Sequence, residues 1–400
     1  MGHRVPFNYG WVIVGTAFVV LTTSYGMIFS YGLFLPHIMI ELDGSRSLAT
    51  LPFSLCVVTY ATLSLFTGRA VDLYGPRPVA LVGAVLLGLG FWGLSRATET
   101  WEVFLFFGVV TGAGMSAAYI PMTATVVRWF KTRRGLALAL ASQGLSASVV
   151  VGPMIAAALI LELSWRPAAF AFAIGGAFII ALSGLTLRQT SGTKEAQAQA
   201  VTATDGLTLG QARRTLQFWI VLTSYLLTWS VLFFPYAHLP GLASDLGFNS
   251  INGAALLGAV GVGGAIGRFT IGSVSDWIGR KAALHIALAL QTLACLLFPL
   301  TDVFVQIYLL ATLFGAGSGA GIALFPAIVG DIFGAKHVGV ISGAIFAFAC
   351  GAGAVGPYVA AVIRETTGSY DTAFWLAAVF NAGAIGLVCV LRGPSSTNKL

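Results

Sequence analysis

The sequence predicts an all-α membrane protein of twelve transmembrane helices, arranged as two pseudo-symmetric six-helix bundles. Three observations lead to this prediction: few charged residues, many long apolar runs, and a repeat that relates the two halves of the chain. Charged residues make up 9% of the 400 residues and hydrophobic residues make up 57%. Soluble domains carry about 25% charged residues, so lipid is expected to cover most of this protein's surface.

Twelve apolar runs are long enough to cross a membrane. A helix needs roughly 20 apolar residues to cross a hydrocarbon core about 30 Å thick. The predicted spans are 11–36, 48–67, 79–96, 102–127, 136–160, 168–187, 217–240, 252–274, 281–300, 303–329, 338–362 and 373–391. The first run is too long for the apolar part of a cleavable signal peptide, so we expect it to stay as a span.

The segment 188–215 differs from the rest of the chain because it is polar, rich in Thr, Ala and Gln, and without an apolar period. Such a composition is typical of a linker. We therefore predict an N-terminal six-helix bundle at 1–187, a cytoplasmic linker at 188–215 and a C-terminal six-helix bundle at 216–400.

Four short patterns recur at nearly the same offset, which predicts an internal repeat. The offsets of 203 or 204 residues relate Gly68–Gly75 to Gly272–Gly279, Gly112–Gly114 to Gly315–Gly317, Gly152-Pro153 to Gly356-Pro357, and Ala169-Phe170 to Ala373-Phe374. Many transporter folds are built from such repeats, with the substrate site at the interface between them.

Lys and Arg predict the orientation. With the N-terminus in the cytoplasm, sixteen of these residues fall on the inner side and four, Arg46, Arg96, Arg166 and Arg364, on the outer side. Cytoplasmic loops are enriched in Lys and Arg, so we expect a multi-pass protein of the cell (inner) membrane with both termini cytoplasmic. The net charge of +7 then belongs to these loops, and without a basic face with interleaved aromatics we expect no nucleic-acid partner.

Two copies of one loop pattern are similar to a known signature. The residues are Gly68, Asp72, Gly75 and Arg77 in the first copy, and Gly272, Asp276, Gly279, Arg280 and Lys281 in the second. The pattern resembles the signature loop of the major facilitator superfamily, and the resemblance extends over essentially the whole chain. It implies a two-bundle transporter that works by alternating access.

A narrower resemblance points to the monocarboxylate transporter group. The stretches Arg128–Ala137 and Tyr9–Trp11 are similar to that group. Arg268, four residues before Gly272, is shared with it and with the related oxalate–formate exchangers, in which the arginine anchors the anion. Similarity to bacterial lactate-type carriers further implies substrate-binding roles for Tyr119, Leu145 and His238.

The chain also departs from these relatives. The resemblance to the oxalate–formate exchangers implies a second cation, a Lys in the eleventh span, whereas 343–351 of this chain contains no Lys. Animal monocarboxylate carriers have an acid one turn before the arginine, where this chain has Gly264, and a Lys in the first span, where 27–35 has no charge. Their proton-coupling residues therefore cannot be transferred to this sequence.

Arg268 is the strongest candidate site residue because it lies inside an apolar span. A charged side chain there costs roughly 2.5–3.5 kcal/mol on insertion scales, and all fourteen Asp and Glu residues fall in predicted loops or at span ends. We expect a substrate carboxylate to bind the guanidinium, whose planar fork matches both carboxylate oxygens. Because one cation balances one negative charge, a monoanion is the favoured substrate. The alternative interpretation of Arg268 is a structural ion pair.

His238 is the second candidate, near the outer end of the seventh span. It lies between Pro235 and Pro240, where a broken helix is expected. Imidazole side chains titrate near pH 6.5, so His238, together with Arg268 and its substrate, is the candidate for proton coupling. The alternative is a histidine that only makes a hydrogen bond between helices.

The signature loops supply four candidate gating residues: Asp72, Arg77, Asp276 and Arg280. Each acid ends a span inside a turn rich in Gly and Arg, so we expect it to pair with Arg and helix ends in one conformation. The Gly-Pro pairs in spans five and eleven predict kinks or points of close helix packing.

The sequence gives no sign of an enzyme. It has no phosphate-binding Gly-Lys-Ser/Thr loop, and the Gly-rich stretch 258–267 lies inside a span without a preceding strand. The four cysteines, in apolar runs, lack metal-ligand spacing, so neither a metal nor a cofactor is expected. We predict a proton-coupled, monomeric carrier of a small, lactate-like monocarboxylate; the alternatives are an oxalate–formate-type anion exchanger and a non-transporting membrane sensor.

Overall fold

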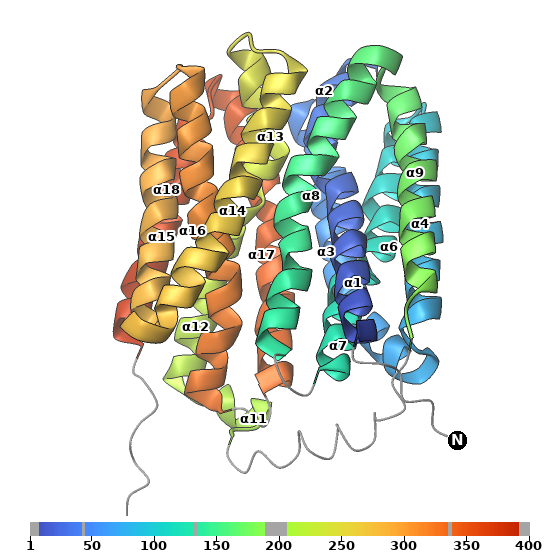
Figure 1. Ribbon diagram of the computed structural model, residues 1–400. Coiled ribbons are helices and arrows are strands. Elements are labelled where there is room, and N and C mark those ends of the chain that lie inside the picture. The colour runs from blue at the N-terminus through green and yellow to red at the C-terminus, as the bar shows by residue number, and fades with distance from the viewer. Residues whose placement is uncertain (1–7, 42–44, 131–133, 189–205, 335–337, 392–400) are drawn as a thin grey trace, which may run out of the picture. The chain divides into compact units, whose positions relative to one another are not determined.

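The computed structural model describes residues 8–41, 45–130, 134–188, 206–334 and 338–391, and within these ranges it contains helices and no strand (Figure 1). Twelve stretches of the described chain are helical, long and apolar enough to cross a membrane. They coincide with the twelve predicted spans to within a few residues, so the predicted all-α, twelve-span fold class is confirmed.

The chain forms two compact units, Met1–Thr193 with Tyr236–Gly261 (unit 1) and Lys194–Pro235 with Val262–Leu400 (unit 2). Unit 1 contains α1 (Asn8–Phe29), α2 (Tyr31–Glu41), α3 (Arg46–Tyr74), α4 (Pro76–Arg96), α5 (Thr100–Val103), the π-helical η1 (Phe104–Thr111), α6 (Gly112–Ser116), α7 (Tyr119–Trp129), α8 (Arg134–Leu163) and α9 (Trp165–Leu185). Unit 2 contains α11 (Leu209–Ala212), α12 (Leu216–Leu232), α15 (Arg280–Leu297), the 3₁₀-helical η2 (Phe298–Leu300), α16 (Phe304–Phe333), α17 (Val338–Thr367) and α18 (Asp371–Val390). Helices α13 (Phe234–Asp245) and α14 (Ser250–Ile278) are shared between the units.

Most of the predicted linker, 189–205, lies outside the described residues. Its described end is not featureless, because Thr208 and Gln211 form a reciprocal capping box around the short helix α11. The backbone N–H of Leu207 donates to the carbonyl of Phe333 at the end of α16. This end of the segment is therefore attached to unit 2.

Glycines bring the helices of unit 1 into backbone contact. A Cβ on Gly152 of α8 would overlap the backbone of Gly26 in α1, and a Cβ on Gly114 of α6 would press on Gly83 and Leu87 of α4. Small residues at helix crossings permit such close approach where lipid provides no hydrophobic force between helices.

The same contacts recur in unit 2 at the offset of the sequence repeat. A Cβ on Gly356 of α17 would overlap the carbonyl oxygen of Ser230 in α12, and one on Gly317 of α16 would press on Ala287 and Gln291 of α15. The prediction that Gly152 and Gly356 mark close-packing points is confirmed, and the internal repeat extends to equivalent helix contacts.

Both copies of the repeat also break their first span at the same place. Helix α1 ends at Phe29 and α2 begins at Tyr31, while α12 ends at Leu232 and α13 begins at Phe234. The second break lies just before Pro235, so the broken helix expected near His238 is confirmed. The signature glycines Gly75 and Gly279 have φ values of 85° and 87°, a backbone conformation that favours glycine.

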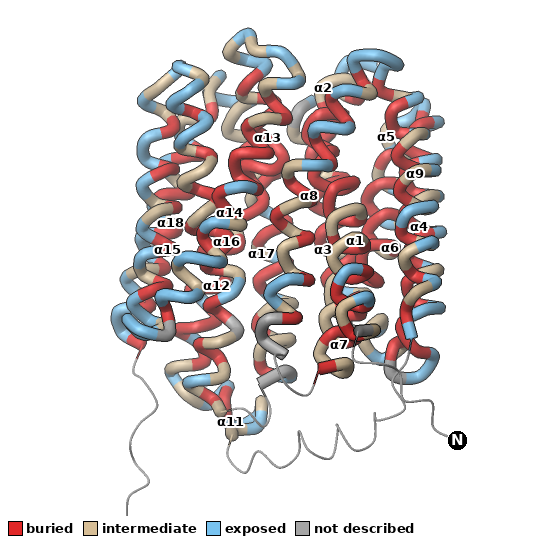
Figure 2. The backbone as a smooth tube through the Cα atoms, viewed as in Figure 1, coloured by how far each residue is buried: buried red, intermediate tan, exposed pale blue. Residues whose placement is uncertain are grey.

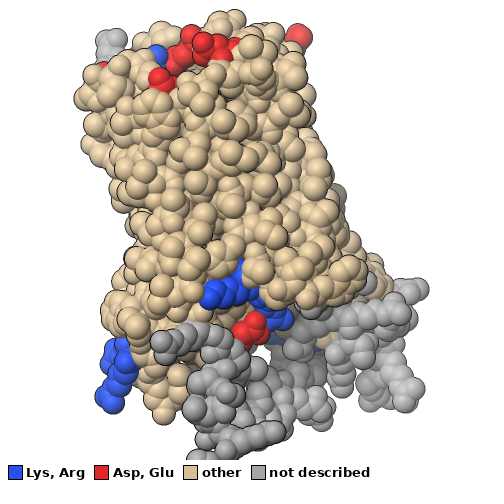
Figure 3. Space-filling model, turned by 90° about the vertical axis from the view of Figure 1, so that its left-hand side faces the viewer, with Lys and Arg blue, Asp and Glu red and all other residues tan. Residues whose placement is uncertain are grey.

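Large apolar side chains remain exposed on the outer faces of the helices. Along α4, α9, α15 and α18, exposed positions alternate with buried ones (Figure 2); they include Val82, Val85, Ile174, Phe178, Leu293 and Val379. On the face drawn in Figure 3, charged side chains gather at the two ends and leave an uncharged band between them. An apolar band with charged ends is the surface that a bilayer covers.

Candidate functional site

Arg268 lies within the unit 2 part of α14, ten residues before the helix ends at Ile278. Arg268 is half-buried. Ten residues of α-helix rise about 15 Å, so its Cα lies well inside the apolar part of the helix. No Asp or Glu occurs in α14 apart from Asp276, whose side chain lies outside the described residues. The expected placement of a cation within the span is therefore met by the structure.

Glycines hold the Arg268 turn against α16. A Cβ on Gly263 would overlap the backbone of Thr312, and a Cβ on Gly267 would overlap that of Ala316. In the reverse direction, a Cβ on Gly319 of α16 would overlap the backbone of Gly264 in α14. Backbone-to-backbone contact over two turns fixes the Cα position of Arg268, because a backbone cannot adapt as a flexible side chain does.

His238 lies in the unit 1 part of α13 and is 2% exposed. The first turn of α13 packs on α2, since a Cβ on Gly32 would lie 2.9 Å from the carbonyl oxygen of Tyr236. The rings of Phe29 and Tyr236 lie 4.4 Å apart between centroids. His238 is thus held in a tightly packed, largely apolar part of unit 1.

Tyr119 and Leu145 also belong to unit 1, and both are half-buried. Tyr119 is the first residue of α7, directly after a turn at Ala117 and Ala118 that interrupts the fourth span. Leu145 lies on α8 beside Ser146, whose carbonyl oxygen would be 2.7 Å from a Cβ on Gly261 of α14. The structure therefore groups Tyr119, Leu145 and His238 in one unit and Arg268 in the other.

Basic and acidic side chains of unit 2 gather at the end where α15 begins and α16 and α18 end. Arg280 Nη1 donates to Asp331 Oδ1 at 2.5 Å and to the carbonyl oxygen of Ala327 at 3.2 Å. Lys281 Nζ donates at 2.8 Å to the carbonyl oxygens of Cys389 and Leu391. Lys281 thereby caps the C-terminal end of α18, where a positive charge is favourable.

Of the four predicted gating residues, Arg280 thus has a described partner, Asp331, which is not one of the four. An acid at the C-terminal end of the tenth span, on the side where basic residues predominate, was the available signal. Arg77 is exposed at the start of α4. The side chains of Asp72 and Asp276 lie outside the described residues.

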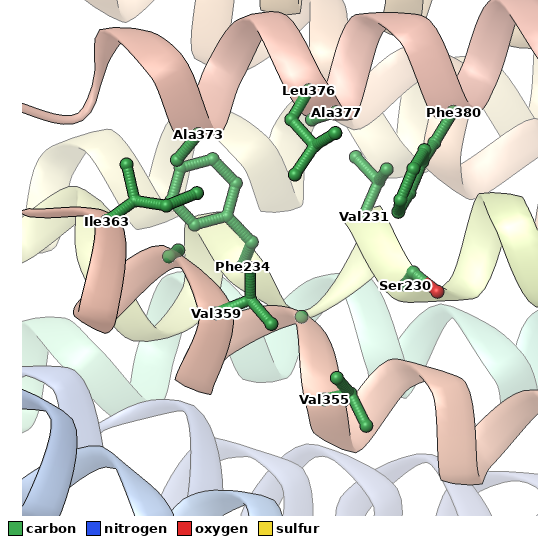
Figure 4. Close-up of a pocket in the computed structure, with 12 residues that line it drawn as sticks. Ser230, Val231, Phe234, Val355, Val359, Ile363, Ala373, Leu376, Ala377 and Phe380 are labelled. Atoms are coloured by element: carbon green, nitrogen blue, oxygen red, sulfur yellow. The ribbon is translucent and has the colours of Figure 1, made fainter.

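A cavity of about 160 Å³ lies inside unit 2 between α12, α17 and α18 (Figure 4). Its lining consists of Ser230, Val231, Phe234, Val355, Gly356, Val359, Ala360, Ile363, Ala373, Leu376, Ala377 and Phe380. The hydroxyl of Ser230 donates to its own helix at the carbonyl of Leu226, 2.7 Å away. With no cation among its lining residues, this cavity suits an apolar group and not a carboxylate.

Within the described ranges, no three His, Cys, Asp or Glu residues lie close enough together to hold a metal ion. Cys56, Cys295 and Cys350 are buried and Cys389 is exposed, and these four cysteines form no disulfide. His285 Nε2 lies 3.1 Å from Cys389 Sγ.

Twelve candidate spans, an internal repeat and a charged residue inside a span together define a polytopic membrane protein of the secondary-transporter class. The sequence profile of the Major Facilitator Superfamily matches residues 17–309 and 255–399, and the chain belongs to this superfamily.

Relatives narrow the similarity further. The chain is 25% identical over 389 residues to "Monocarboxylate transporter 13" of Rattus norvegicus, covering 96% of this chain and 89% of the relative. It is 26% identical over 389 residues to "Monocarboxylate transporter 11" of Homo sapiens, covering 92% and 80%. The chain is therefore monocarboxylate transporter-like at low identity.

A solved structure shares the fold. It is a bacterial homologue of the human lysosomal transporter Spinster, in an inward-facing and unoccupied conformation, with a TM-score of 0.73. The match covers 97% of both chains at 12% sequence identity. At this identity the likeness concerns the fold alone.

Proposed function

We infer that the protein carries a small, lactate-like monocarboxylate across the cell membrane and that Arg268 binds the carboxylate. The observation that carries this inference is a guanidinium inside an apolar helix, with its turn fixed by the glycine contacts between α14 and α16. The names of the relatives support the substrate class. Tyr119, Leu145 and His238 are proposed to contact the rest of the substrate.

The charge of the site argues for a monoanion. A single guanidinium balances one negative charge, and its two parallel N–H groups match the two oxygens of one carboxylate. A second carboxylate would enter the apolar part of the protein without a matched cation, which costs several kcal/mol. A neutral substrate would not use the guanidinium at all.

Uptake of labelled mono- and dicarboxylates into proteoliposomes tests the proposal. We expect Arg268→Ala to be inactive and Arg268→Lys to be severely impaired, because an ammonium does not reproduce the planar fork. The matched control is Arg364→Lys, which makes the same change at the end of α17 and should transport normally. Normal uptake by correctly inserted Arg268→Ala would reject the anchor.

Net transport is proposed to be driven by a symported proton. A proton cancels the carboxylate charge, so the loaded carrier moves no net charge against the membrane potential. An inward proton gradient should then accelerate uptake. If uptake ignores the gradient and depends on preloaded internal anion, the protein is an exchanger of the oxalate–formate type.

The proposed orientation places both termini and the signature loops in the cytoplasm. Lys281 and Asp302 offer a matched test because they lie at opposite ends of the ninth span. In a Cys389→Ser background, a membrane-impermeant maleimide should label Asp302→Cys in intact cells but Lys281→Cys only after permeabilisation. The reverse pattern would overturn the topology.

Transport is proposed to proceed by alternating access in a monomer, with Asp72, Arg77, Asp276 and Arg280 in the inner gate. Replacing either acid by Asn removes a charge that can pair with Arg or with a helix end. We expect a shift toward inward-open forms with substrate binding largely kept. Unchanged accessibility of cysteines at the inner helix ends in both Asn variants would count against this role.

A further inference from the structure

Two amide side chains lie in the middle of unit 2 with their polar groups unsatisfied. Gln291 on α15 and Asn381 on α18 are both 0% exposed. None of the described residues hydrogen-bonds to Nε2 or Oε1 of Gln291, or to Nδ2 or Oδ1 of Asn381. Leaving a buried polar atom unpaired is costly, so such atoms in folded proteins call for a partner.

The packing of α15 against α18 places these two residues at the same level. The helices run antiparallel, and the rings of Phe298 and Phe374 stack with centroids 4.5 Å apart. Gln291 lies seven residues before Phe298, and Asn381 lies seven residues after Phe374. Seven residues are two helical turns, so both amides project from the faces that bear the stacked rings.

The other copy of the repeat shows that this polar pair is a departure from a common design. The equivalent positions in unit 1, at the offset of 204 residues, are Leu87 on α4 and Ala177 on α9. The equivalence is structural as well, because Gly114 packs on Leu87 as Gly317 packs on Gln291. Both apolar positions of unit 1 are amides in unit 2, so the two changes concern one shared location.

The seam between α15 and α18 is also the looser one. In unit 1, α4 and α9 pack more extensively than α15 and α18 do, and a Cβ on Gly88 would lie 2.9 Å from the Cβ of Ala177. The residue equivalent to Gly88 is Thr292, whose hydroxyl donates to Leu288 of its own helix. The α15 and α18 backbones are therefore in close contact over a smaller area than those of α4 and α9.

We propose that Gln291 and Asn381 form a buried binding site for a water molecule. An amide offers N–H donors and a carbonyl acceptor, and water offers two donors and two lone pairs. One water molecule between the side chains can donate to both carbonyl oxygens and accept from both nitrogens, so it reaches all four unsatisfied atoms. Buried waters in proteins make two to four such bonds.

The site joins three helices of unit 2 behind the Arg268 turn. Gln291 packs on Gly317 of α16, and Gly319, nearly opposite on the same helix, packs on Gly264 of α14. The amide pair and the Arg268 turn therefore lie on nearly opposite sides of α16. The water site rests on the packing of unit 2 and stands whether or not Arg268 binds a monocarboxylate.

A double-mutant cycle tests the pairing through thermal unfolding of the full chain in nanodiscs. Gln291→Leu and Asn381→Ala should each lower Tm, by roughly 5 °C, because each leaves the other amide with fewer partners. The double variant carries the residues of unit 1, and its Tm should lie above that of either single variant. Shifts that simply add in the double variant would show that the amides do not share a site.

A high-resolution structure of the wild-type protein tests the ligand, even if the variants fail to fold. Density for one water within hydrogen-bond distance of both amides is expected, and it should be absent from the seam between α4 and α9, which serves as the internal control. Direct hydrogen bonds between Gln291 and Asn381, with no density between them, would overturn the water site.

Discussion

The α4–α9 seam of unit 1 and the α15–α18 seam of unit 2 descend from the same repeat but are filled differently. In unit 1 the seam is closed by Gly88 against Ala177, with Leu87 buried beside them. In unit 2 the equivalent seam contains Gln291 and Asn381 and packs less extensively. The repeat thus conserves where helices cross, while the residues at the crossings decide how tightly they close.

The same asymmetry extends to the candidate site. Four residues before the signature glycine, unit 2 has Arg268, whereas unit 1 has Ser64. Ser64 is buried and donates to the carbonyl of Tyr60 on its own helix at 2.6 Å, so it needs no outside partner. Unit 2 therefore has a cation within a span where unit 1 has a neutral serine, and it also contains the amide pair and the apolar cavity.

The largest effect is expected at the two equivalent helix crossings, one inside each unit. Gly152→Val and Gly356→Val each force a side chain into helix backbone, which cannot move aside, so the loss should exceed the roughly 1–3 kcal/mol of an overpacked core. We expect no folded protein from either variant in size-exclusion chromatography. Gly386→Ala, where a Cβ meets nothing within 4 Å, is the control. A folded Gly152→Val protein with normal Tm would refute the tight crossing.

The next largest effect is expected for His238→Gln, which distinguishes proton coupling from substrate transport itself. His238 occupies the position of buried Phe34 in the first copy of the repeat. If His238 takes up the symported proton, His238→Gln should abolish accumulation driven by a pH gradient but keep counterflow exchange, which needs no net proton movement. Both processes can be measured in one proteoliposome preparation.

A second outcome of that experiment would assign the proton elsewhere. If the substrate and Arg268 manage the charge between them, His238→Gln should lower affinity and leave coupling intact. Full retention of both affinity and coupling would remove His238 from the site, leaving it a histidine that only packs and hydrogen-bonds.

The smallest effect concerns the ionic contacts at the helix ends. Glu41 of unit 1 accepts from Trp165 Nε1 at 2.8 Å and pairs with Arg166 at 2.8 Å, while Arg280 and Asp331 form the pair of unit 2. All four charged side chains are about a third or more exposed. Glu41→Gln should therefore cost less than about 1 kcal/mol, and the loss should shrink in high salt.

Thermal unfolding at low and high salt measures this effect, with Asp331→Asn as the matched variant in unit 2. The two variants should behave alike, because both pairs are solvent-exposed. A loss in Glu41→Gln as large as that of the glycine variants would show that the contact is a structural brace of unit 1.

The fold could be predicted from the sequence to a large extent because span length and apolar composition are local properties. The twelve spans and the contacts of Gly152 and Gly356 are all apparent in single segments or in the repeat. The sequence does not predict the interruption at Ser30, because the run 11–36 is uncharged throughout and its break depends on how α1 and α2 pack. The domain boundaries at 188 and 215 stay a prediction.

The site could be predicted only in part. Arg268 stands out because a charge in a span is visible in the sequence alone. Asp331 as the partner of Arg280, and the shared level of Gln291 and Asn381, depend on the register of helices 50 to 90 residues apart, which composition does not encode. Aligning the two copies of the repeat would have shown Leu87 replaced by Gln291 and Ala177 by Asn381.

Equilibrium binding of labelled lactate to the purified protein tests the central claim most directly. Lactamide, its neutral analogue, is the ligand control, and Arg268→Ser gives unit 2 the residue that unit 1 has at Ser64. We predict that the wild-type protein binds lactate and not lactamide, and that folded Arg268→Ser binds lactate roughly 100-fold more weakly, as expected for lost charge-assisted hydrogen bonds. Equal affinity of Arg268→Ser and wild type for lactate, or equal binding of lactate and lactamide, would contradict it.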